Sequence, residues 1–155
     1  MNFSWIDYKE FSNTTNDFFD SEAMKQTDLD DFDSYLSYWT SDGGAVYNED
    51  FFCKVAFERD TPIGVVVLGK DRDGMFTFSA VVVAPVRRKK GYGTAILREI
   101  LTKSSAIIGC KITHARAVIF PGNAASIRAF EKAGFRLIGQ HPDGDVLYYE
   151  YTKKD

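Results

Sequence analysis

The chain has 155 residues, of which 45% are hydrophobic and 15% aromatic, and this is enough apolar material for the core of one ordinary domain. These values exclude a disordered or fibrous protein. No apolar run approaches the roughly 18 residues that a membrane-spanning helix needs, and the N-terminus lacks the basic start and apolar block of a signal peptide. We therefore expect a cytoplasmic protein with no membrane partner.

The net charge of −3 conceals an uneven distribution along the chain. Residues 1–60 carry 14 acidic and 4 basic side chains, a net charge of −10, whereas residues 61–155 carry 8 acidic and 15 basic side chains, a net charge of +7. The basic residues concentrate in only one tetrapeptide, Arg-Arg-Lys-Lys at residues 87–90. One short cluster suits a few phosphate groups better than a duplex, so we expect no nucleic-acid partner.

The two cysteines, Cys53 and Cys110, lie far apart inside apolar stretches. Neither has the local pairing or the histidine spacing of a zinc or redox site. Both are therefore expected to be reduced core residues, and no metal is expected in the protein.

Two elements are predicted in the first fifty residues. Residues 3–8 are compatible with a short strand. An amphipathic helix is predicted where apolar side chains recur at helical spacing among aspartates, which the helix macrodipole favours near a helix start. The apolar positions are Leu29, Phe32, Leu36 and Trp39, and the aspartates are Asp28, Asp30, Asp31 and Asp33.

From residue 51 onward the pattern alternates strands with helices. β-rich runs separated by short polar turns predict strands, and a stripe of apolar residues ended by a glycine predicts each helix. The predicted elements are, in chain order, strands over 51–58, 62–69 and 75–84, a helix over 91–108, a strand over 112–120, a helix over 123–134 and strands over 135–140 and 146–152.

The most informative segment is residues 81–94, where a buried strand stops at Pro85 and reopens as a helix through Gly91 and Gly93. The start of a helix leaves backbone N–H groups without partners, and glycines let the main chain approach a phosphate. The four cations of residues 87–90 add an attraction that salt screens. The segment therefore predicts an anion site, and the alternative is a glycine turn packed beside a solvated basic patch. A Walker loop or a dinucleotide site is excluded, because the Gly-Lys-Ser/Thr ending and the third glycine are absent.

Residues 123–135 form a second pattern, in which Asn123 caps an amphipathic helix that ends at a glycine followed by an aromatic residue. Alone, this pattern indicates only a well-capped helix. Together, the two segments resemble the GCN5-related N-acetyltransferase (GNAT) superfamily. Arg88-x-x-Gly91-x-Gly93 is similar to the coenzyme A loop of that family, and residues 123–135 are similar to its second signature, which ends in Glu-Lys-x-Gly-Phe.

The resemblance implies an α/β (α+β) fold in which a mixed sheet of six or seven strands is flanked by about four helices. The sheet would be splayed between the strand ending at Val83 and the one ending near Phe120, and the pantetheine arm of the coenzyme would lie in that gap. Residues 1–155 would form a single domain, with residues 1–50 on the substrate side and residues 51–155 as the coenzyme A-binding core.

The same resemblance implies a set of site residues. The backbone amide of Val83 would face the acetyl oxygen, and it is the one catalytic group that can be assigned. The residues implied in binding acetyl-CoA are Val81, Val83, Arg88, Lys89, Lys90, Gly91, Tyr92, Gly93, Thr94, Asn123, Ser126 and Phe130.

The sequence departs from the family pattern at both catalytic side chains. Many relatives carry a tyrosine seven residues after the helix asparagine as the proton donor to sulfur, and here that position is Phe130. The strand over 75–83 also lacks the glutamate that several relatives use to deprotonate the amine. The general acid and base are therefore unassigned. Substitutes, each more readily explained as a packed or structural residue, are Tyr35, Tyr38, Tyr148, Tyr149, Tyr151, His114 and His141.

The resemblance implies an N-acetyltransferase that moves an acetyl group from acetyl-CoA to a primary amine of a small molecule or peptide by direct attack. Two other functions remain open: a non-catalytic acyl-CoA-binding sensor, which Phe130 suggests, and a nucleotide-phosphate binder with the same anion loop. Monomer and homodimer are equally compatible with the sequence.

The acidic N-terminal part suggests a cationic acceptor. In this family the wall opposite the coenzyme is usually built from the N-terminal helices and the last hairpin. The hypothesis is that acidic side chains of this wall attract a cationic amine, and the alternative is an ordinary solvated face. The residues concerned are Asp28, Asp30, Asp31, Asp33, Glu49 and Asp50.

Overall fold

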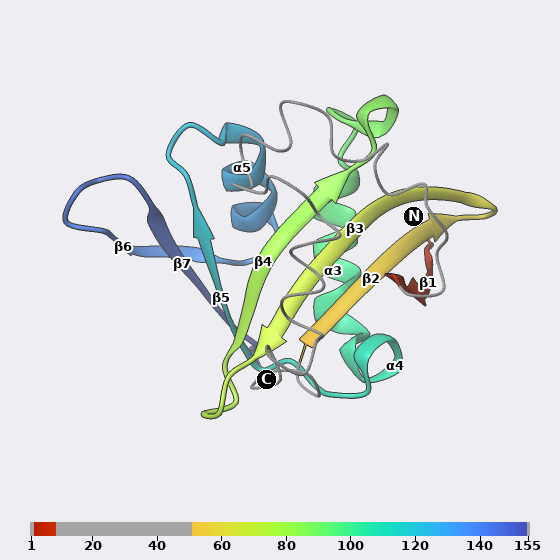
Figure 1. Cartoon of the computed structure of the whole chain (residues 1–155), viewed down its shortest axis with the longest axis horizontal. Coiled ribbons are helices and arrows are strands. Elements are labelled where there is room, and N and C mark those ends of the chain that lie inside the picture. The colour runs from red at the N-terminus through yellow and green to blue at the C-terminus, as the bar shows by residue number, and fades with distance from the viewer. Residues whose placement is uncertain (1, 9–50, 155) are drawn as a thin grey trace, which may run out of the picture.

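One seven-stranded sheet organises the part of the chain that the structure describes (Figure 1). The computed structural model describes residues 2–8 and 51–154, so the predicted acidic helix lies outside the described residues. The strands are β1 (Ser4–Asp7), β2 (Phe51–Glu58), β3 (Thr61–Lys70), β4 (Phe76–Val83), β5 (His114–Ile119), β6 (Arg136–Gln140) and β7 (Leu147–Thr152). The helices are α3 (Tyr92–Thr102), α4 (Ser104–Ile108) and α5 (Ala124–Lys132), with a short 3-10 helix η4 (Pro85–Arg87).

The sheet is mixed, as predicted. Its strand order is β1-β2-β3-β4-β5-β7-β6, and every neighbouring pair is antiparallel except β4 and β5, which are parallel. Each strand expected from residue 51 onward is present, and residues 3–8 contain the edge strand β1. Within residues 2–8 and 51–154, none of the helices is both long enough and apolar enough to cross a bilayer.

The two parallel strands part soon after they meet, which confirms the predicted splay. Their pairing ends at Phe78 and Ala117, although β4 continues to residue 83 and β5 to residue 119. On its other side, β4 contains a bulge at the same place, because Val67 pairs with Ala80 while the next β3 residue pairs with Phe78, so that Ser79 is the extra residue. A bulge bends a strand and increases its twist. The bend therefore coincides with the point where β4 leaves β5.

The bulge also changes which side of the sheet the even-numbered side chains of β4 point to. Before it, Phe76 and Phe78 belong to the core on the helix side of the sheet. After it, Ala80 and Val82 belong to a second cluster with residues of β2 and β3. The helix-side core is completed by Ile96, Leu97, Ile100 and Leu101 of α3, Ile108 of α4 and Phe130 of α5. Because α3 and α5 pack on the same face of the sheet, the N-terminal ends of both helices lie beside the gap between β4 and β5.

The helix predicted over residues 91–108 is broken, which corrects the expectation of one long helix. Lys103 leaves the helical conformation (φ −115°, ψ 26°) and caps the start of α4, accepting the N–H groups of Ala106 and Ile107. The buried Ser104 hydroxyl accepts the N–H of Ile112 at 2.9 Å, which directs the chain back toward β5. Gly109 ends α4 in the left-handed conformation (φ 76°), as predicted.

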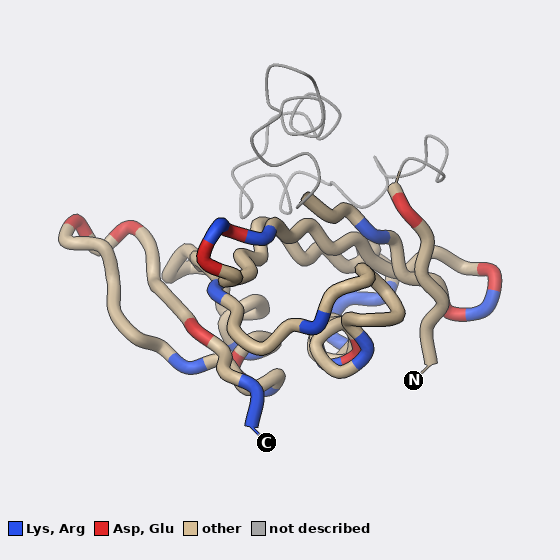
Figure 2. Tube along the Cα trace, turned by 90° about the horizontal axis from the view of Figure 1, so that it is seen from below, with Lys and Arg blue, Asp and Glu red and all other residues tan. Residues whose placement is uncertain are grey.

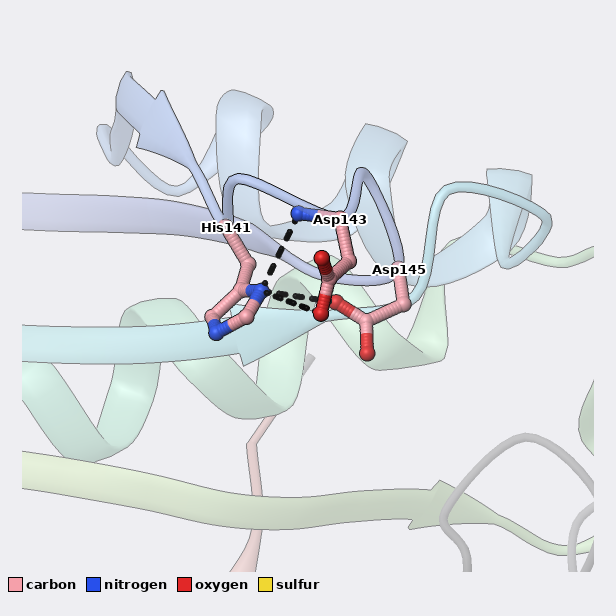
Figure 3. Close-up of side chains that lie close together, drawn as sticks. All are labelled: His141, Asp143 and Asp145. Atoms are coloured by element: carbon pink, nitrogen blue, oxygen red, sulfur yellow. Dashed lines mark hydrogen bonds and ion pairs between the residues drawn. The ribbon is translucent and has the colours of Figure 1, made fainter.

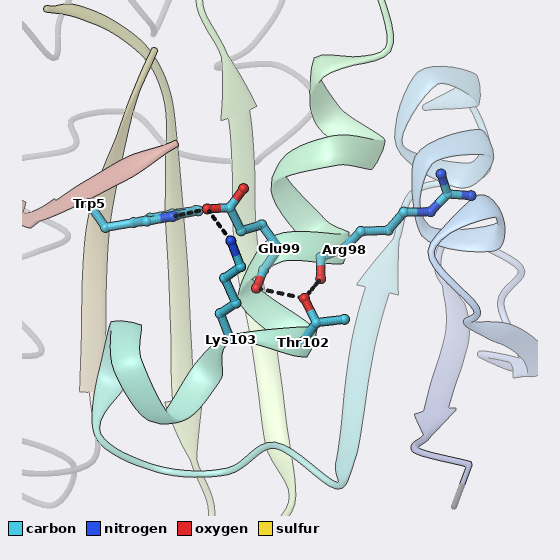
Figure 4. A network of polar contacts seen from close by, with 5 residues as sticks. All are labelled: Trp5, Arg98, Glu99, Thr102 and Lys103. Atoms are coloured by element: carbon cyan, nitrogen blue, oxygen red, sulfur yellow. Dashed lines mark hydrogen bonds and ion pairs between the residues drawn. The ribbon is translucent and has the colours of Figure 1, made fainter. Parts of the chain in front are cut away.

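A buried carboxylate joins β1 to α3 (Figure 4). Glu99, only 8% exposed, accepts the indole N–H of Trp5 at 3.3 Å, and Lys103 Nζ lies 3.9 Å from the same oxygen. The hydroxyl of Thr102 donates to the carbonyls of Arg98 and Glu99 within the last turn of α3. Because Trp5 and Glu99 are 94 positions apart, this contact ties the N-terminal edge strand of the sheet to α3.

The structure confirms the predicted core position for Cys53 and corrects it for Cys110. Both are free thiols, as predicted. Cys53 is buried, and burial raises the pKa of its thiol. Cys110 is only partly buried because it lies in the connection after α4 rather than in a packed element.

The contact between α3 and β3 depends on a glycine. A Cβ at Gly64 would lie 2.6 Å from Ile96 Cδ1 and 3.1 Å from the carbonyl oxygen of Val82. Gly64→Val should therefore lower the free energy of unfolding by about 1–3 kcal/mol through overpacking, as measured by urea denaturation. The same substitution at the strand glycine Gly139, which has nothing within 4 Å, serves as the control and should change stability by no more than about 0.5 kcal/mol. Equal effects at the two positions would refute this account of the packing.

Candidate functional site

A cavity of about 650 Å³ opens between the parted ends of β4 and β5. Among the described residues, it is lined by β4 from Phe78 onward, the connection from β4 into α3, the end of β5 and one side of α5. The volume is in the range of sites for small molecules and cofactors. The cavity therefore lies beside the part of β4 that no longer pairs with β5.

The backbone amides of Val81 and Val83 face this gap. The N–H of Ala84 donates to Ile63 of β3 at 2.9 Å, and in an antiparallel ladder every second residue points to the same neighbour. Val82 and Ala84 therefore point toward β3, while Val81 and Val83 point the other way. Arg88 confirms this direction, because its Nε donates to the carbonyl of Val83 at 3.0 Å. The N–H groups of Val81 and Val83 are consequently presented where β5 no longer pairs with β4.

The connection from β4 to α3 turns sharply in front of the gap. Lys89 and Gly91 both have left-handed backbone conformations (φ 63° and 83°), which glycine adopts freely and lysine rarely. The first hydrogen bond of α3 runs from the Ala95 N–H to the Gly91 carbonyl at 3.1 Å. The amides of the three preceding residues have no acceptor inside the helix. Such amides, together with the dipole of α3, are suited to bind an anion.

Two of the four predicted cations hold this loop in place. The Tyr92 hydroxyl donates to Glu58 of β2 at 2.8 Å, and Arg87 lies 3.3 Å from the same hydroxyl and 3.5 Å from the carboxylate. Arg88 is bonded to Val83, as described above. Residues 87–90 were predicted to form one cluster of four cations that attracts an anion. Within this cluster both arginines have internal partners, and Lys89 and Lys90 are the two exposed cations.

On the other side of the gap, α5 presents a capped start and a buried aromatic residue. The side chain of Asn123 accepts the N–H of Ser126 at 3.1 Å, which confirms the predicted cap. Phe130 is 5% exposed and packs edge-on against Phe78 and Phe135, with ring centroids 6.0 and 4.9 Å apart. The position where relatives carry a tyrosine is thus an apolar part of the cavity wall.

Residues 9–135 match the family model described as Acetyltransferase (GNAT) family. The chain belongs to this family. It is also 32% identical over 93 residues to the uncharacterized N-acetyltransferase YfmK of Bacillus subtilis (strain 168), a match that covers 59% of this chain and 58% of that protein.

Solved GNAT structures have the same fold at low sequence identity. The aminoglycoside acetyltransferase AAC(6')-Ib, in complex with coenzyme A and kanamycin, superimposes with a TM-score of 0.72 at 17% identity and covers 97% of this chain and 94% of its own. The Campylobacter jejuni N-acetyltransferase PseH, in complex with acetyl coenzyme A, has a TM-score of 0.68 at 15% identity over 99% of this chain and 100% of its own. These likenesses support the GNAT fold of the sheet and helices described above.

Most of the residues predicted for the coenzyme site of this GNAT chain lie together. All of them line the cavity except Lys90, which is exposed on the loop outside it. Four further residues of α5 line the same cavity and were not predicted: Ala125, Arg128, Ala129 and Lys132. Their spacing of three and four residues was a usable signal, because it places them on one side of a helix.

None of the predicted substitutes within the described residues lines the cavity. Tyr149 is buried and its hydroxyl donates to Glu131 at 3.4 Å, and Tyr151 packs on Phe135. Tyr148 and His114 also lie outside the described lining of the cavity. Tyr35 and Tyr38 lie outside the described residues.

His141 belongs to a separate cluster at the tip of the β6–β7 hairpin (Figure 3). Its Nδ1 lies 3.6 Å from a carboxylate oxygen of Asp143 and 3.4 Å from one of Asp145, and it accepts the N–H of Asp143 at 3.3 Å. Figure 2 shows this hairpin projecting from the rest of the described chain with acidic positions at its tip. The three side chains are spaced to approach one ion, but the hydrogen bond within the turn already accounts for the geometry, and they are not part of the cavity lining.

The tyrosine that holds the loop should make stability depend on alkaline pH. The hydrogen bond to Glu58, more than burial, raises the pKa of Tyr92 above its usual value of about 10. A group whose pKa is raised by folding stabilises the protein fully below its unfolded pKa and loses that contribution as the pH rises through the folded pKa. The stability difference between the native chain and Tyr92→Phe should therefore be constant up to about pH 10 and shrink above it, as measured by urea denaturation across the pH range. A difference that stays constant well above pH 10 would contradict the assignment.

Proposed function

We propose that this chain is an N-acetyltransferase that moves an acetyl group from acetyl-CoA to a primary amine. The observation that carries the proposal is the combination of the Val81 and Val83 amides, which lie beyond the end of the β4–β5 pairing, with the helix start at Tyr92, all facing one cavity. An acyl-CoA has matching groups in the same order: a thioester carbonyl, an arm with two amides and a diphosphate. Family membership and the coenzyme-bound relatives support this choice of ligand.

The binding of the coenzyme depends mainly on main-chain groups. The amides of the pantetheine arm bond to the edge of β4 beyond its pairing with β5. The arm thereby takes the place that a neighbouring strand would occupy. The diphosphate takes the N–H groups at the start of α3. Lys89 adds a cation at the rim. Because amides carry these contacts, substitution of a single side chain of the loop should weaken binding less than distortion of its backbone.

The chemistry requires positioning, charge stabilisation and a proton. The amine attacks the thioester carbon, the bond to sulfur breaks, and the proton lost by nitrogen must reach the thiolate. In our proposal the N–H of Val83 donates to the carbonyl oxygen and stabilises the charge that develops there. Phe130 has no proton to give, and the hydroxyl of Tyr92 is already bonded to Glu58. Among residues 2–8 and 51–154, the remaining hydroxyls that line the cavity belong to Ser79, Thr94 and Ser126. These hydroxyls and water are the proton sources that this part of the chain offers.

A non-catalytic acyl-CoA sensor is the second candidate function. The observation in its favour is the burial of Phe130 between Phe78 and Phe135, which makes the expected acid position fully apolar. Such a protein would keep the coenzyme site and lack turnover. The two functions therefore share every binding contact and differ in whether an amine releases thiol.

The proposal is tested by release of coenzyme A thiol in the presence of acetyl-CoA and a panel of amines. Gly91→Val should raise the KM for acetyl-CoA at least about tenfold, because a Cβ there enters open space beside the anion site and strains a left-handed backbone (φ 83°). Gly109→Val is the matched control: Gly109 is also left-handed (φ 76°) with nothing within 4 Å, but it lies outside the cavity lining. It should destabilise the fold and leave this KM unchanged.

Three outcomes are distinguishable in this experiment. Thiol release that depends on an amine and is impaired in Gly91→Val supports the enzyme. Binding of acetyl-CoA without any amine-dependent thiol supports the sensor. Absence of binding to the native chain, with protection against thermal unfolding by ATP instead, overturns both in favour of a nucleotide-phosphate binder.

The acceptor in this proposal is a cationic amine attracted by the acidic N-terminal part of the chain. Replacing Asp28 and Asp31 by lysine should raise the KM for the best amine several-fold and leave the KM for acetyl-CoA unchanged, because an acidic wall concentrates cations. Asp60→Lys with Asp73→Lys, in two exposed turns, makes the same change of charge as a control. If both pairs change the amine KM equally, the effect is one of net charge and the acidic wall is not the acceptor site.

A further inference from the structure

The cavity between β4 and β5 has residues of both sheet faces in its lining. On the helix side these include Phe78, Leu97 and Phe130, which belong to the helix-side core. On the opposite face they include Ala80 and Val82, which belong to the second cluster. The cavity therefore extends through the gap between the two strands, and two ligands can meet in it from opposite sides of the sheet.

The helix side is the side of the coenzyme in the proposed function. The first turn of α3 lies there, because a Cβ at Gly93 would lie 3.7 Å from Cγ2 of Val83 and 3.6 Å from the Cβ of Ala129. An acceptor amine has to reach the thioester carbonyl from a direction that the coenzyme does not occupy. The acceptor is therefore expected to approach from the face opposite the helices.

Val118 gives that opposite face an exposed apolar surface beside the gap. Its neighbours in β5, Ala117 and Ile119, belong to the helix-side core. Since alternate residues of a strand point to opposite faces, Val118 points away from the helices. It lines the cavity and is 47% exposed. One exposed valine on a sheet is ordinary, but this valine lies where the acceptor would enter.

Tyr148 extends this surface onto β7. It lies directly opposite Val118 in the antiparallel ladder, and it faces away from the helices because Tyr149 belongs to the helix-side core. The Lys153 N–H donates to the Thr113 carbonyl at 2.8 Å, which by alternation makes Val118 and Tyr148 a non-hydrogen-bonded pair. The side chains of such a pair lie closer together than those of a hydrogen-bonded pair. The two residues therefore form one strip that leads from the cavity over β7.

The charges nearest to this strip neutralise each other. Arg116 donates to Glu150 at 3.3 Å, and the two are the next pair along the same face. Within residues 2–8 and 51–154, none of the side chains that line the cavity is acidic. This wall of the cavity consequently offers apolar contact to an acceptor and no carboxylate to a second ammonium group.

We propose that Val118 and Tyr148 bind the part of the acceptor beyond its amino group, and that the acceptor is a monoamine on an apolar alkyl or aryl group. The inference rests on the proposed function, because it concerns the acceptor of the same reaction. The single ammonium group is the cation that the acidic N-terminal part attracts in that proposal. The strip adds binding energy in proportion to the apolar area that it removes from water, whereas a second charge at the far end of the acceptor would have to lose its hydration.

The test compares hexylamine with 1,6-diaminohexane in the thiol-release assay. The two amines have the same chain and differ by one ammonium group at the far end. For the native chain, kcat/KM should be at least about tenfold higher for hexylamine. In Val118→Thr with Tyr148→Thr, which keeps residues that favour strands, this ratio should fall to within about threefold. The KM for acetyl-CoA should stay unchanged, because the strip lies on the other face of the sheet.

Two further variants separate this role from a general effect on the sheet. Tyr148→Phe keeps the ring and should retain the native ratio, since the ring and not the hydroxyl forms the strip. Leu137→Thr with Ile138→Thr is the matched control, because it removes two apolar side chains of β6 that are each 54% exposed and lie outside the cavity lining. This pair should also retain the native ratio.

The outcomes distinguish the inference from the proposed function. Equal or better turnover of the diamine by the native chain overturns the inference, as does a native ratio that survives in the Val118 and Tyr148 variant or is lost equally in the control pair. In each of these cases, amine-dependent thiol release still supports the enzyme. Binding of acetyl-CoA without thiol release by any amine would instead remove the proposed function, and the inference with it.

Discussion

The site depends on one constraint, the early end of the pairing between β4 and β5. A parallel ladder that continued past Phe78 would consume the amides of Val81 and Val83 and close the sheet. The bulge at Ser79 bends β4 at this point, and α3 and α5 pack on the same face behind it. A sheet edge is thereby opened in the middle of the sheet, where its unpaired groups are available to a ligand rather than to another chain.

Side-chain contacts hold the loop over residues 84–91 in place, and part of its backbone lines the cavity. Glu58, Tyr92 and Arg87 tie it to β2, and Arg88 ties it to β4. Left-handed conformations at Lys89 and Gly91 are unfavourable or restrictive for most residues. They persist because the surrounding hydrogen bonds determine the turn. The basic tetrapeptide consequently has two roles, with its arginines directed inward and its lysines outward.

Helix α5 contributes residues both to the core and to the cavity lining. Phe130 contributes to an aromatic cluster in place of a proton donor. Small and basic residues of the same helix line the cavity as well. Because Phe130 lines the cavity but has no proton to give, ligand binding and turnover are separate questions for this member of the GNAT family.

The sequence by itself determined most of the elements and the tight turn before α3, because local chemistry decides both. Alternating apolar residues specify strands, Asn123 specifies a helix cap, and Gly91 permits a turn that few residues adopt. The predictions that failed, a continuous helix through Lys103 and a core position for Cys110, depend on how α4 returns to β5 rather than on local pattern. Only the tertiary structure decided which cations line the cavity and which amides of β4 lie beyond its pairing with β5. Those properties follow from contacts between distant segments, such as Glu58 with Tyr92 and Gly93 with Ala129, and no periodicity within one segment encodes them.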